Sequence, residues 1–247
     1  MLYNDTIAAI ATGMTSSGIG IIRISGSDAF AVAEKIFRPH KKDKRLSEQE
    51  TYTIHYGTIM DGKEILDEVI VLLMKGPHSY TAEDTVEIDC HGGVFVMKKI
   101  LELVLRNGAR VAEPGEFTKR VFLNGRIDLL QAESVIDIID AKSERELKAG
   151  MNQLEGQLSK KIHGIKQKIM DVMVNVEVDI DYPEYDVEEV TNAEIKGMLD
   201  IVISDLEKLE KSFDNGKILK DGVKTAIIGK PNAGKSSLLN AILKEDR

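Results

Sequence analysis

The first 115 residues combine short runs of β-branched side chains with two amphipathic helical patterns. Runs rich in isoleucine, valine and threonine predict strands at residues 19–25, 51–60, 65–75 and 85–90. The turn Asp61-Gly62 lies between the second and third runs and indicates that they form a hairpin. Helical periodicity spans residues 27–37 and 94–107, and Gly108 suits the end of the second helix. This pattern is typical of an α+β domain.

From Phe117 the apolar period lengthens from 2 to about 3.6 residues, the period of a helix. One apolar stripe consists of Leu154, Leu158, Ile162, Ile165, Ile169, Met173 and Val176. A second consists of Ile195, Leu199, Val202, Leu206, Leu209 and Phe213. Residues 172–180 also alternate as a strand would, but they continue the first stripe without a turn, so we expect a helix that ends at Tyr182-Pro183. The sequence predicts a helical bundle whose pattern changes after Asn215-Gly216 and Asp221-Gly222.

A β-branched run at residues 223–228 predicts a strand before Gly229–Ser236, which matches the phosphate-loop pattern G-x-x-x-x-G-K-S/T in full. The glycines let the backbone curl so that N–H groups point at phosphate oxygens, and the helix that follows adds a partial positive charge. Lys235 would meet the β- and γ-phosphates, and the Ser236 hydroxyl would hold Mg²⁺. The residues expected to bind a nucleoside triphosphate are Asn232, Ala233, Gly234, Lys235, Ser236 and Ser237. The alternative is a glycine turn before a helix that binds nothing.

Only 12 residues follow Lys235. A nucleoside triphosphatase domain needs further strands, a second acidic metal ligand and a segment that positions the attacking water, and none of these fits in that length. We therefore expect that this chain alone hydrolyses nothing, that the catalytic residues are absent from it, and that it belongs to a longer protein. The element that recognises the base is missing too, so these residues do not distinguish guanine from adenine.

Composition narrows the possible classes of protein. The chain has 247 residues, with 33 basic and 41 acidic side chains and a formal net charge of −8, which argues against non-specific binding to nucleic acid or to an anionic membrane. No apolar stretch approaches the ~20 residues that cross a bilayer, and the N-terminus lacks the layout of a signal peptide. The single cysteine, Cys90, forms no internal disulfide, so we expect a reducing compartment, by default the cytoplasm.

Several segments together resemble one known family. They are Asp5–Thr12, Gly20–Gly26, His91–Gly93, Pro114–Arg120, Asn124–Leu129 and Gly229–Asn240. In this order they closely resemble the MnmE family, also called TrmE, of tRNA-modification GTPases, and the resemblance covers the whole chain. It implies an N-terminal α+β domain of tetrahydrofolate-binding type at 1–117, the first part of a helical domain at 118–216, and the incomplete start of a Ras-like P-loop α/β G domain at 217–247.

The resemblance also implies an activity and partners. Members of the family hydrolyse GTP and act with the FAD-dependent protein MnmG, in a heterotetramer, on certain tRNAs. Together they add an aminomethyl or carboxymethylaminomethyl group to carbon 5 of the wobble uridine, with a folate one-carbon unit such as that of 5-formyltetrahydrofolate. Hydrolysis in the family depends on K⁺ as well as Mg²⁺, and the N-terminal domains form a homodimer with folate near its interface.

Carried over to this sequence, the folate-binding residues of the family match Arg23, Glu87 and Arg126, the last at a position where the family has a basic residue. An arginine can pair with the glutamate tail of folate and a carboxylate can accept from pterin N–H groups, although the sequence leaves open which group meets which end. The family's K⁺-binding asparagine matches Asn232. The alternatives are an exposed Arg23–Glu87 pair on a strand face and a simple turn residue at 232.

Other interpretations remain. The phosphate loop is equally compatible with a regulatory or ribosome-assembly GTPase whose N-terminal region is a dimerisation or RNA-docking module. A third possibility is a folate-binding, dimerising protein with a vestigial phosphate loop.

Cys90 is expected to be a buried small hydrophobic side chain. His91 lacks further ligands at the spacing of a zinc site, so we expect it in a turn or in packing.

Overall fold

The computed structural model describes residues 5–40, 45–181, 192–221 and 225–244. The chain divides into two compact units, the first made of residues 1–141 and 150–159 and the second of residues 142–149 and 160–247. Within the described ranges, no helix has both the length and the apolar composition needed to cross a membrane.

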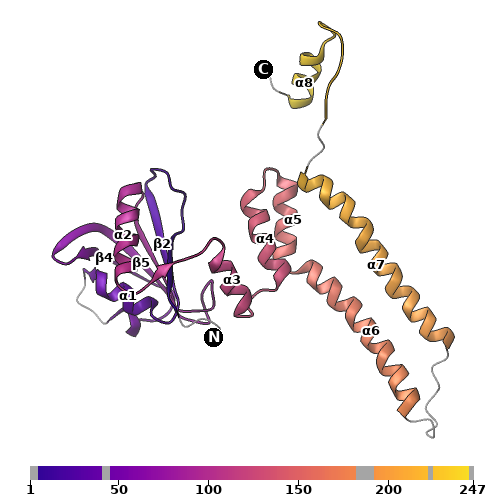
Figure 1. Cartoon of the computed structure of the whole chain (residues 1–247), viewed down its shortest axis with the longest axis horizontal. Helices are drawn as coiled ribbons and strands as arrows, with labels where there is room; N and C mark the ends of the chain where they lie inside the picture. The colour runs from indigo at the N-terminus through magenta and orange to yellow at the C-terminus, as the bar shows by residue number, and fades with distance from the viewer. Residues whose placement is uncertain (1–4, 41–44, 182–191, 222–224, 245–247) are drawn as a thin grey trace. The chain divides into compact units, whose positions relative to one another are not determined.

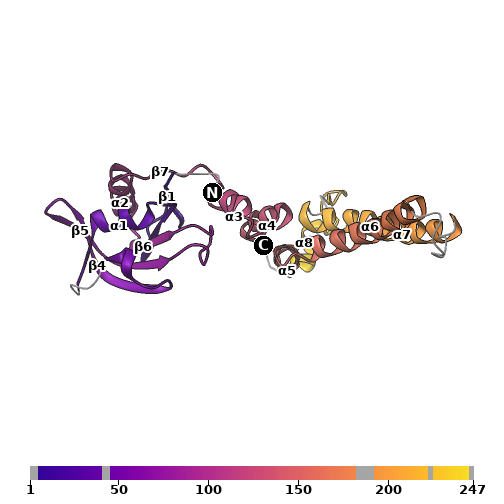
Figure 2. The same ribbon diagram turned by 90° about the horizontal axis from the view of Figure 1, so that it is seen from below.

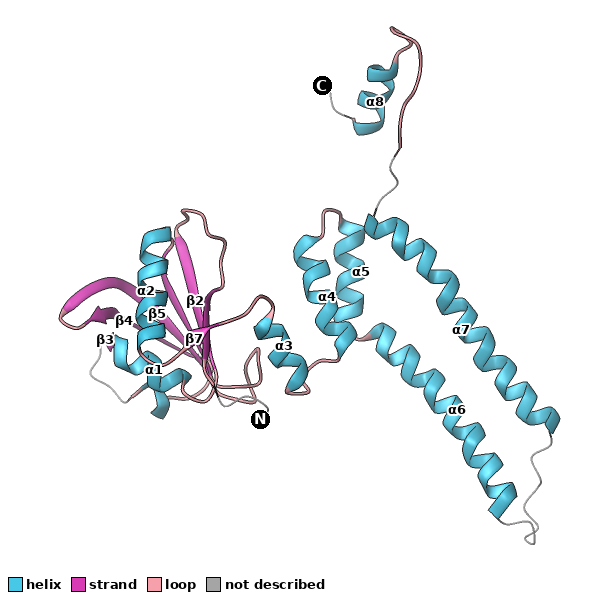
Figure 3. Ribbon diagram, in the orientation of Figure 1, coloured by secondary structure: helices cyan, strands magenta, loops and turns pink. Residues whose placement is uncertain are grey.

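The first unit is built on one mixed sheet of seven strands (Figures 1 and 3). The strands are β1 (Ile7–Ile10), β2 (Ile19–Ser25), β3 (Phe37–Pro39), β4 (Thr53–Asp61), β5 (Glu64–Met74), β6 (Thr85–His91) and β7 (Arg110–Val111). Their order across the sheet is β3-β4-β5-β6-β2-β1-β7, and every neighbouring pair is antiparallel except β1 and β7. The four predicted strands and the hairpin are therefore confirmed, whereas β1 and the short edge strands β3 and β7 were not predicted.

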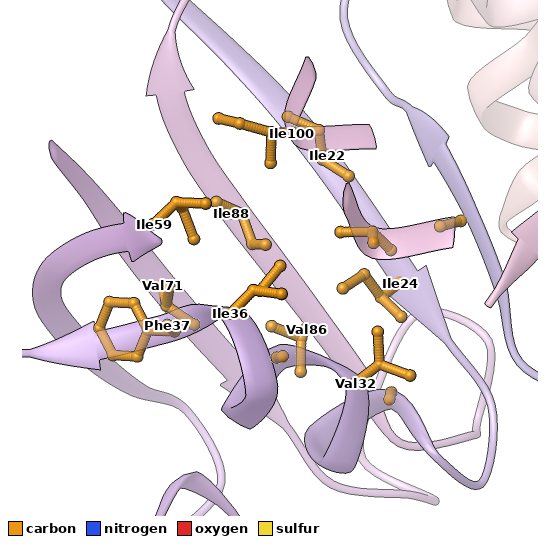
Figure 4. Close-up of a cluster of buried hydrophobic side chains, with 14 of the residues drawn as sticks. Ile22, Ile24, Val32, Ile36, Phe37, Ile59, Val71, Val86, Ile88 and Ile100 are labelled. Carbon is orange, nitrogen blue, oxygen red and sulfur yellow. The ribbon is translucent and has the colours of Figure 1, made fainter. Parts of the chain in front are cut away.

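Two helices, α1 (Ala29–Ile36) and α2 (Val94–Arg106), supply the side chains that cover one face of this sheet. Alternate residues of each strand point into the core, so Ile22 of β2 and Ile88 of β6 are fully buried against Ile36 and Ile100 of the helices (Figure 4). The intervening strand residues point to the opposite face. A 3₁₀ turn at Leu46–Glu48 follows β3 in the chain.

Three shorter helices follow the sheet: α3 (Glu116–Leu123), α4 (Leu129–Asp140) and α5 (Glu144–Leu154). A capping box starts α4, because the Asp128 side chain accepts from the backbone N–H of Gln131 while the Gln131 side chain accepts from that of Asp128. The Gln131 amide also donates to the carbonyl of Leu154 at 2.6 Å. This bond joins α4 to the end of α5.

The second unit contains two long helices, α6 (Gln157–Asp181) and α7 (Asn192–Asp221), which lie side by side in both views (Figures 1 and 2). Val172 of α6 and Val202 of α7 are buried, and Lys168 pairs with Asp205 at 2.7 Å. The alternating segment from residue 172 is helical, as expected, up to Asp181; Tyr182-Pro183, its predicted end, lies outside the described residues.

α7 continues through Asn215-Gly216, after which the sequence pattern changes, because one glycine costs a helix only about 1 kcal/mol and does not remove a backbone hydrogen-bond donor. One sequence prediction about this unit is wrong. The predicted strand at 223–228 is absent over residues 225–228, because a strand requires a neighbouring strand and these residues join no sheet in the described part of the chain. Residues 223 and 224 lie outside that part.

Candidate functional site

Arg23 and Glu87 form an ion pair across the centre of the sheet. The antiparallel register of β2 and β6 places the two residues directly opposite each other. Arg23 Nε donates to Glu87 Oε1 at 2.6 Å, and the two side chains are 26% and 16% exposed. Arg23 follows the buried Ile22 on β2, and Glu87 precedes the buried Ile88 on β6. Because neighbouring residues of a strand point to opposite faces, Arg23 and Glu87 lie on the face that α1 and α2 do not cover. The pair is thus partly buried rather than fully solvated.

Tyr80 brings the third predicted residue to this pair. The guanidinium carbon of Arg23 lies 5.1 Å from the centroid of the Tyr80 ring and 5.5 Å from that of Phe117. The guanidinium carbon of Arg126 lies 5.6 Å from the same Tyr80 centroid, and its Nη1 donates to the Tyr80 carbonyl at 2.6 Å. The structure therefore places Arg23 and Arg126 beside one aromatic side chain, and Glu87 joins this group through its ion pair with Arg23.

The sequence analysis did not identify the two aromatic residues of this cluster. Phe117 lies within the segment Pro114–Arg120 that carried the family resemblance, so its position was marked but not its role. Tyr80 lies in the segment between β5 and β6, where no periodicity or motif distinguishes it. Only the tertiary contacts reveal it.

A buried ionic cluster fixes α3 next to this site. The Arg120 guanidinium on α3 is fully buried and binds three carboxylates: Asp5 at 2.8 Å, Glu83 at 3.2 Å and, one turn earlier on the same helix, Glu116 at 3.1 Å. Arg110 also donates to both carboxylate oxygens of Glu116. The hydrogen bond from Arg110 is the largest of several effects that lower the pKa of Glu116 from 4.5 to about 2. An uncompensated charge here would be costly, so the cluster holds these segments in one arrangement.

Further hydrogen bonds anchor the segment that carries Tyr80. Thr81 is fully buried, shares a hydrogen bond with the Ser25 hydroxyl at 2.7 Å, and its carbonyl accepts from Asn124 at 2.8 Å. Ser25 also donates to Glu83 at 2.9 Å. The Tyr80 hydroxyl itself is hydrogen-bonded to Thr118 at 3.1 Å. The backbone on either side of Tyr80 is consequently fixed by groups from β2 and from the region of α3.

Asp89 is the next carboxylate along this face of β6. Its Oδ1 is buried and has no hydrogen-bond partner in the described part of the chain. Burial raises the pKa of Asp89 above its usual range, and the nearby Glu87 raises it further. The face thus carries one paired and one poorly compensated carboxylate.

The predicted phosphate loop lies in the second unit. Asn232 and Gly234 have positive φ angles of 60° and 78°, and α8 (Lys235–Leu243) begins immediately after them, so the turn and the helix start occur where the motif predicts. The Lys235 ammonium donates to the carbonyls of Gly229 at 3.0 Å and Lys230 at 2.8 Å. Ser236 and Ser237 belong to the first turn of α8. The lysine side chain therefore folds back over its own loop.

The residues next to the Arg23–Glu87 pair on β6 have other roles. Cys90 is 4% exposed, its thiol donates to the Gly20 carbonyl at 3.2 Å, and burial raises its pKa to about 11, which confirms the expected buried side chain. His91 Nδ1 pairs with Asp67 Oδ1 at 2.6 Å. In the described ranges, no three His, Cys, Asp or Glu side chains are grouped so that they could hold a metal ion.

Two family models match successive parts of the chain. The model described as "GTP-binding protein TrmE N-terminus" matches residues 6–126, and the model described as "MnmE helical domain" matches residues 129–246. The first match contains the Arg23–Glu87 pair and Arg126, and the second contains the phosphate loop.

Curated proteins are similar over the whole chain. A protein of Clostridioides difficile named tRNA modification GTPase MnmE is 53% identical over 247 residues, which are 100% of this chain and 54% of that protein. A protein with the same name from Lachnoclostridium phytofermentans is 52% identical over 100% of this chain and 54% of its own length. Another, from Thermoanaerobacter pseudethanolicus, is 54% identical over 98% of this chain and 53% of its own length. The chain spans about half the length of the curated relatives it matches.

Proposed function

The chain belongs to the MnmE family, also called TrmE, whose curated members are named tRNA modification GTPases, and we propose from this premise that it forms part of such an enzyme. In this proposal the whole protein hydrolyses GTP and, with an FAD-dependent MnmG partner, adds an aminomethyl or carboxymethylaminomethyl group to carbon 5 of the wobble uridine of certain tRNAs. The observation that supports the folate part of this function is that Arg23 and Arg126 both lie beside the Tyr80 ring while Glu87 pairs with Arg23.

We assign three regions to this function. Residues 1–117 form the folate-binding and dimerisation domain, residues 118–216 form the first part of the helical domain, and residues 217–247 begin the Ras-like G domain. Both proposed boundaries fall inside helices, the first in α3 and the second in α7, so these helices would pass from one region to the next.

The residues of the first site fit a reduced folate in their chemistry. Folate carries a glutamate tail with two carboxylates, and the site offers two guanidinium groups, of which that of Arg126 lies within 4 Å of no carboxylate in the part of the chain that the structure describes. The pterin ring carries N–H groups, and Glu87 offers carboxylate oxygens. When bound, 5-formyltetrahydrofolate or a related tetrahydrofolate would supply the one-carbon unit. Arg23, Glu87 and Arg126 would bind and orient it.

The residues of the phosphate loop fit GTP with its cations. Backbone N–H groups from Asn232 to Ser237 would meet phosphate oxygens, because positive φ at Asn232 and Gly234 curls this segment into the start of α8. Lys235 would exchange its bonds to loop carbonyls for the β- and γ-phosphates. Ser236 would hold Mg²⁺ and Asn232 would contact K⁺. In the whole protein, Lys235→Ala should abolish hydrolysis and leave dimerisation unchanged, as a GTPase assay with size-exclusion chromatography would measure.

The remaining assignments follow from the family. The protein would be a cytoplasmic homodimer through its N-terminal domain, and would form a heterotetramer with MnmG that acts on tRNA.

Calorimetric titration of 5-formyltetrahydrofolate into the 247-residue chain tests the folate assignment. Wild-type chain should show saturable binding, and both Arg23→Ala and Arg126→Ala should weaken it about tenfold or more, because each removes a charged hydrogen-bonding group from the site. Arg106→Ala is the matched control, because Arg106 on α2 pairs with Asp61 at the surface.

Absence of binding to a folded chain would refute the folate assignment. It would favour the alternative, a regulatory or ribosome-assembly GTPase whose N-terminal region only dimerises or docks on RNA. Equal weakening by Arg106→Ala would show that the site lies elsewhere. In the whole protein, failure to restore the wobble-uridine modification in cells that lack it would refute the wider proposal.

A further inference from the structure

We propose that Tyr80 is a positioning residue for the two site arginines, and that its aromatic ring rather than its hydroxyl group performs this role. The inference rests on the proposed folate site, because it concerns how Arg23 and Arg126 are held for a ligand. The ring lies 5.1 Å and 5.6 Å from the two guanidinium carbons, so one side chain contacts both cations.

Arg126 depends on Tyr80 more than Arg23 does. Arg23 is also held by Glu87 and by the ring of Phe117. Arg126 is exposed, and the contacts recorded for its guanidinium in the described ranges are the Tyr80 ring and the Tyr80 carbonyl. A free arginine side chain has many rotamers, and a ligand that fixes it in one of them pays an entropic cost on binding. A ring that already orients the guanidinium lowers that cost.

Tyr80 is itself held in place before any ligand arrives. Its neighbours Ser79 and Thr81 are buried, Ser79 donates to the Glu83 carbonyl, and Asn124 donates to the Thr81 carbonyl. Arg120 binds the Glu83 side chain on the same segment. The ring is therefore presented by a rigid segment rather than by a free loop, which is what a positioning residue requires.

The ring and the hydroxyl have separate contacts, so they can be tested separately. The ring meets the two guanidinium groups, whereas the hydroxyl is hydrogen-bonded to Thr118. Tyr80→Phe keeps the ring contacts and loses the hydroxyl. Tyr80→Leu keeps an apolar side chain and the carbonyl that accepts from Arg126, but removes the ring.

The test is calorimetric titration of 5-formyltetrahydrofolate into the 247-residue chain. Tyr80→Leu should weaken binding about tenfold, because two cation–π contacts of roughly 0.5–1 kcal/mol each are lost and every 1.4 kcal/mol is tenfold. Tyr80→Phe should bind within about twofold of wild type. Tyr56→Leu is the control, since Tyr56 on β4 is half exposed and has no contact with either arginine.

A double-mutant cycle distinguishes positioning from general damage to the fold. If Tyr80 acts through Arg126, then Tyr80→Leu should have much less effect when Arg126 is already alanine. A substitution that merely loosens the domain would weaken binding by the same factor in both backgrounds. If Tyr80→Leu lowers the urea midpoint of the chain, Tyr80→Met replaces it in the same cycle, because methionine fills the space without a ring.

The outcomes separate this inference from the proposed function. Binding that both arginine substitutions weaken and Tyr80→Leu does not would overturn the inference alone. The same holds for additive effects in the cycle, or for a Tyr80→Phe variant as weak as Tyr80→Leu, which would assign the role to the hydroxyl. No binding to wild-type chain would overturn both the folate assignment and the inference.

Discussion

Glu116→Gln should lower the free energy of unfolding of the first unit by about 3 kcal/mol at pH 7. The Glu116 side chain is 3% exposed and accepts hydrogen bonds from Arg110, Arg120 and the backbone N–H of Glu113. These partners lower its pKa from 4.5 to about 2. Each unit of pKa shift corresponds to about 1.4 kcal/mol, so the folded state favours the ionised form by about 3 kcal/mol more than the unfolded state does. Glutamine keeps the size of the side chain but loses the stabilisation that the ionised carboxylate provides.

The size of the effect should depend on pH in a defined direction. Because the pKa of Glu116 is lower in the folded state, its stabilising contribution is fully present above pH 4.5 and is lost as the pH falls toward 2. The difference between wild type and Glu116→Gln should therefore shrink to roughly half by pH 3. Wild type should lose stability over this range, and the variant should lose less.

Urea unfolding followed by tyrosine fluorescence measures this, since the chain has no tryptophan and the first unit contains Tyr52, Tyr56 and Tyr80. Glu113→Gln is the matched control, because Glu113 is an exposed glutamate three residues away. The reasoning would be refuted if Glu116→Gln were as stable as wild type at pH 7. It would also be refuted if the difference stayed constant from pH 7 to pH 3.

Further predictions concern other parts of the first unit. Cys90 should react negligibly with a thiol reagent at pH 8 in the native chain and fully in urea, because it is buried and its pKa is about 11; rapid native labelling would contradict this. Gly57→Ala should lower the free energy of unfolding, measured with urea, by about 2 kcal/mol or more, because a Cβ at this position would lie 2.3 Å from a backbone carbonyl oxygen of β3. Gly18→Ala is the control and should change it little, because the space around Gly18 is open. Asp89→Asn should raise the free energy of unfolding at pH 7, because burial and the nearby Glu87 disfavour the charged form. The raised pKa means that this gain should vanish as the pH falls below 3.8, and a gain that persists at pH 3 would show another cause.

The regular elements could be predicted wherever one periodicity dominated. Alternation in β2 and β6 separates the buried Ile22 and Ile88 from Arg23 and Glu87, because side chains of a strand point alternately to its two faces. The 3.6-residue stripe of α6 outweighed a competing alternation, since the apolar face was continuous. The α+β domain followed by a helical region was predictable on this basis, while the proposed domain boundaries remain predictions.

Prediction failed where a neighbour decided the outcome. Residues 225–228 have the composition of a strand, but composition cannot supply the neighbouring strand that a sheet requires. The strands β3 and β7, of three and two residues, are too short for a pattern and exist because longer strands lie next to them.

The sequence by itself determined the two faces of each strand and the start of the helix after the predicted phosphate loop. Through the family resemblance it also singled out Arg23, Glu87 and Arg126 as candidate folate-binding residues. Only the tertiary structure decided that the two arginines meet at Tyr80, with Glu87 paired to Arg23, and that Arg120 is fully buried. An arginine on a short amphipathic helix is expected in water. It is buried here because Asp5 and Glu83 join the neighbouring Glu116 of α3 in compensating its charge, and no local pattern encodes contacts with residues as distant in the chain as Asp5 and Glu83.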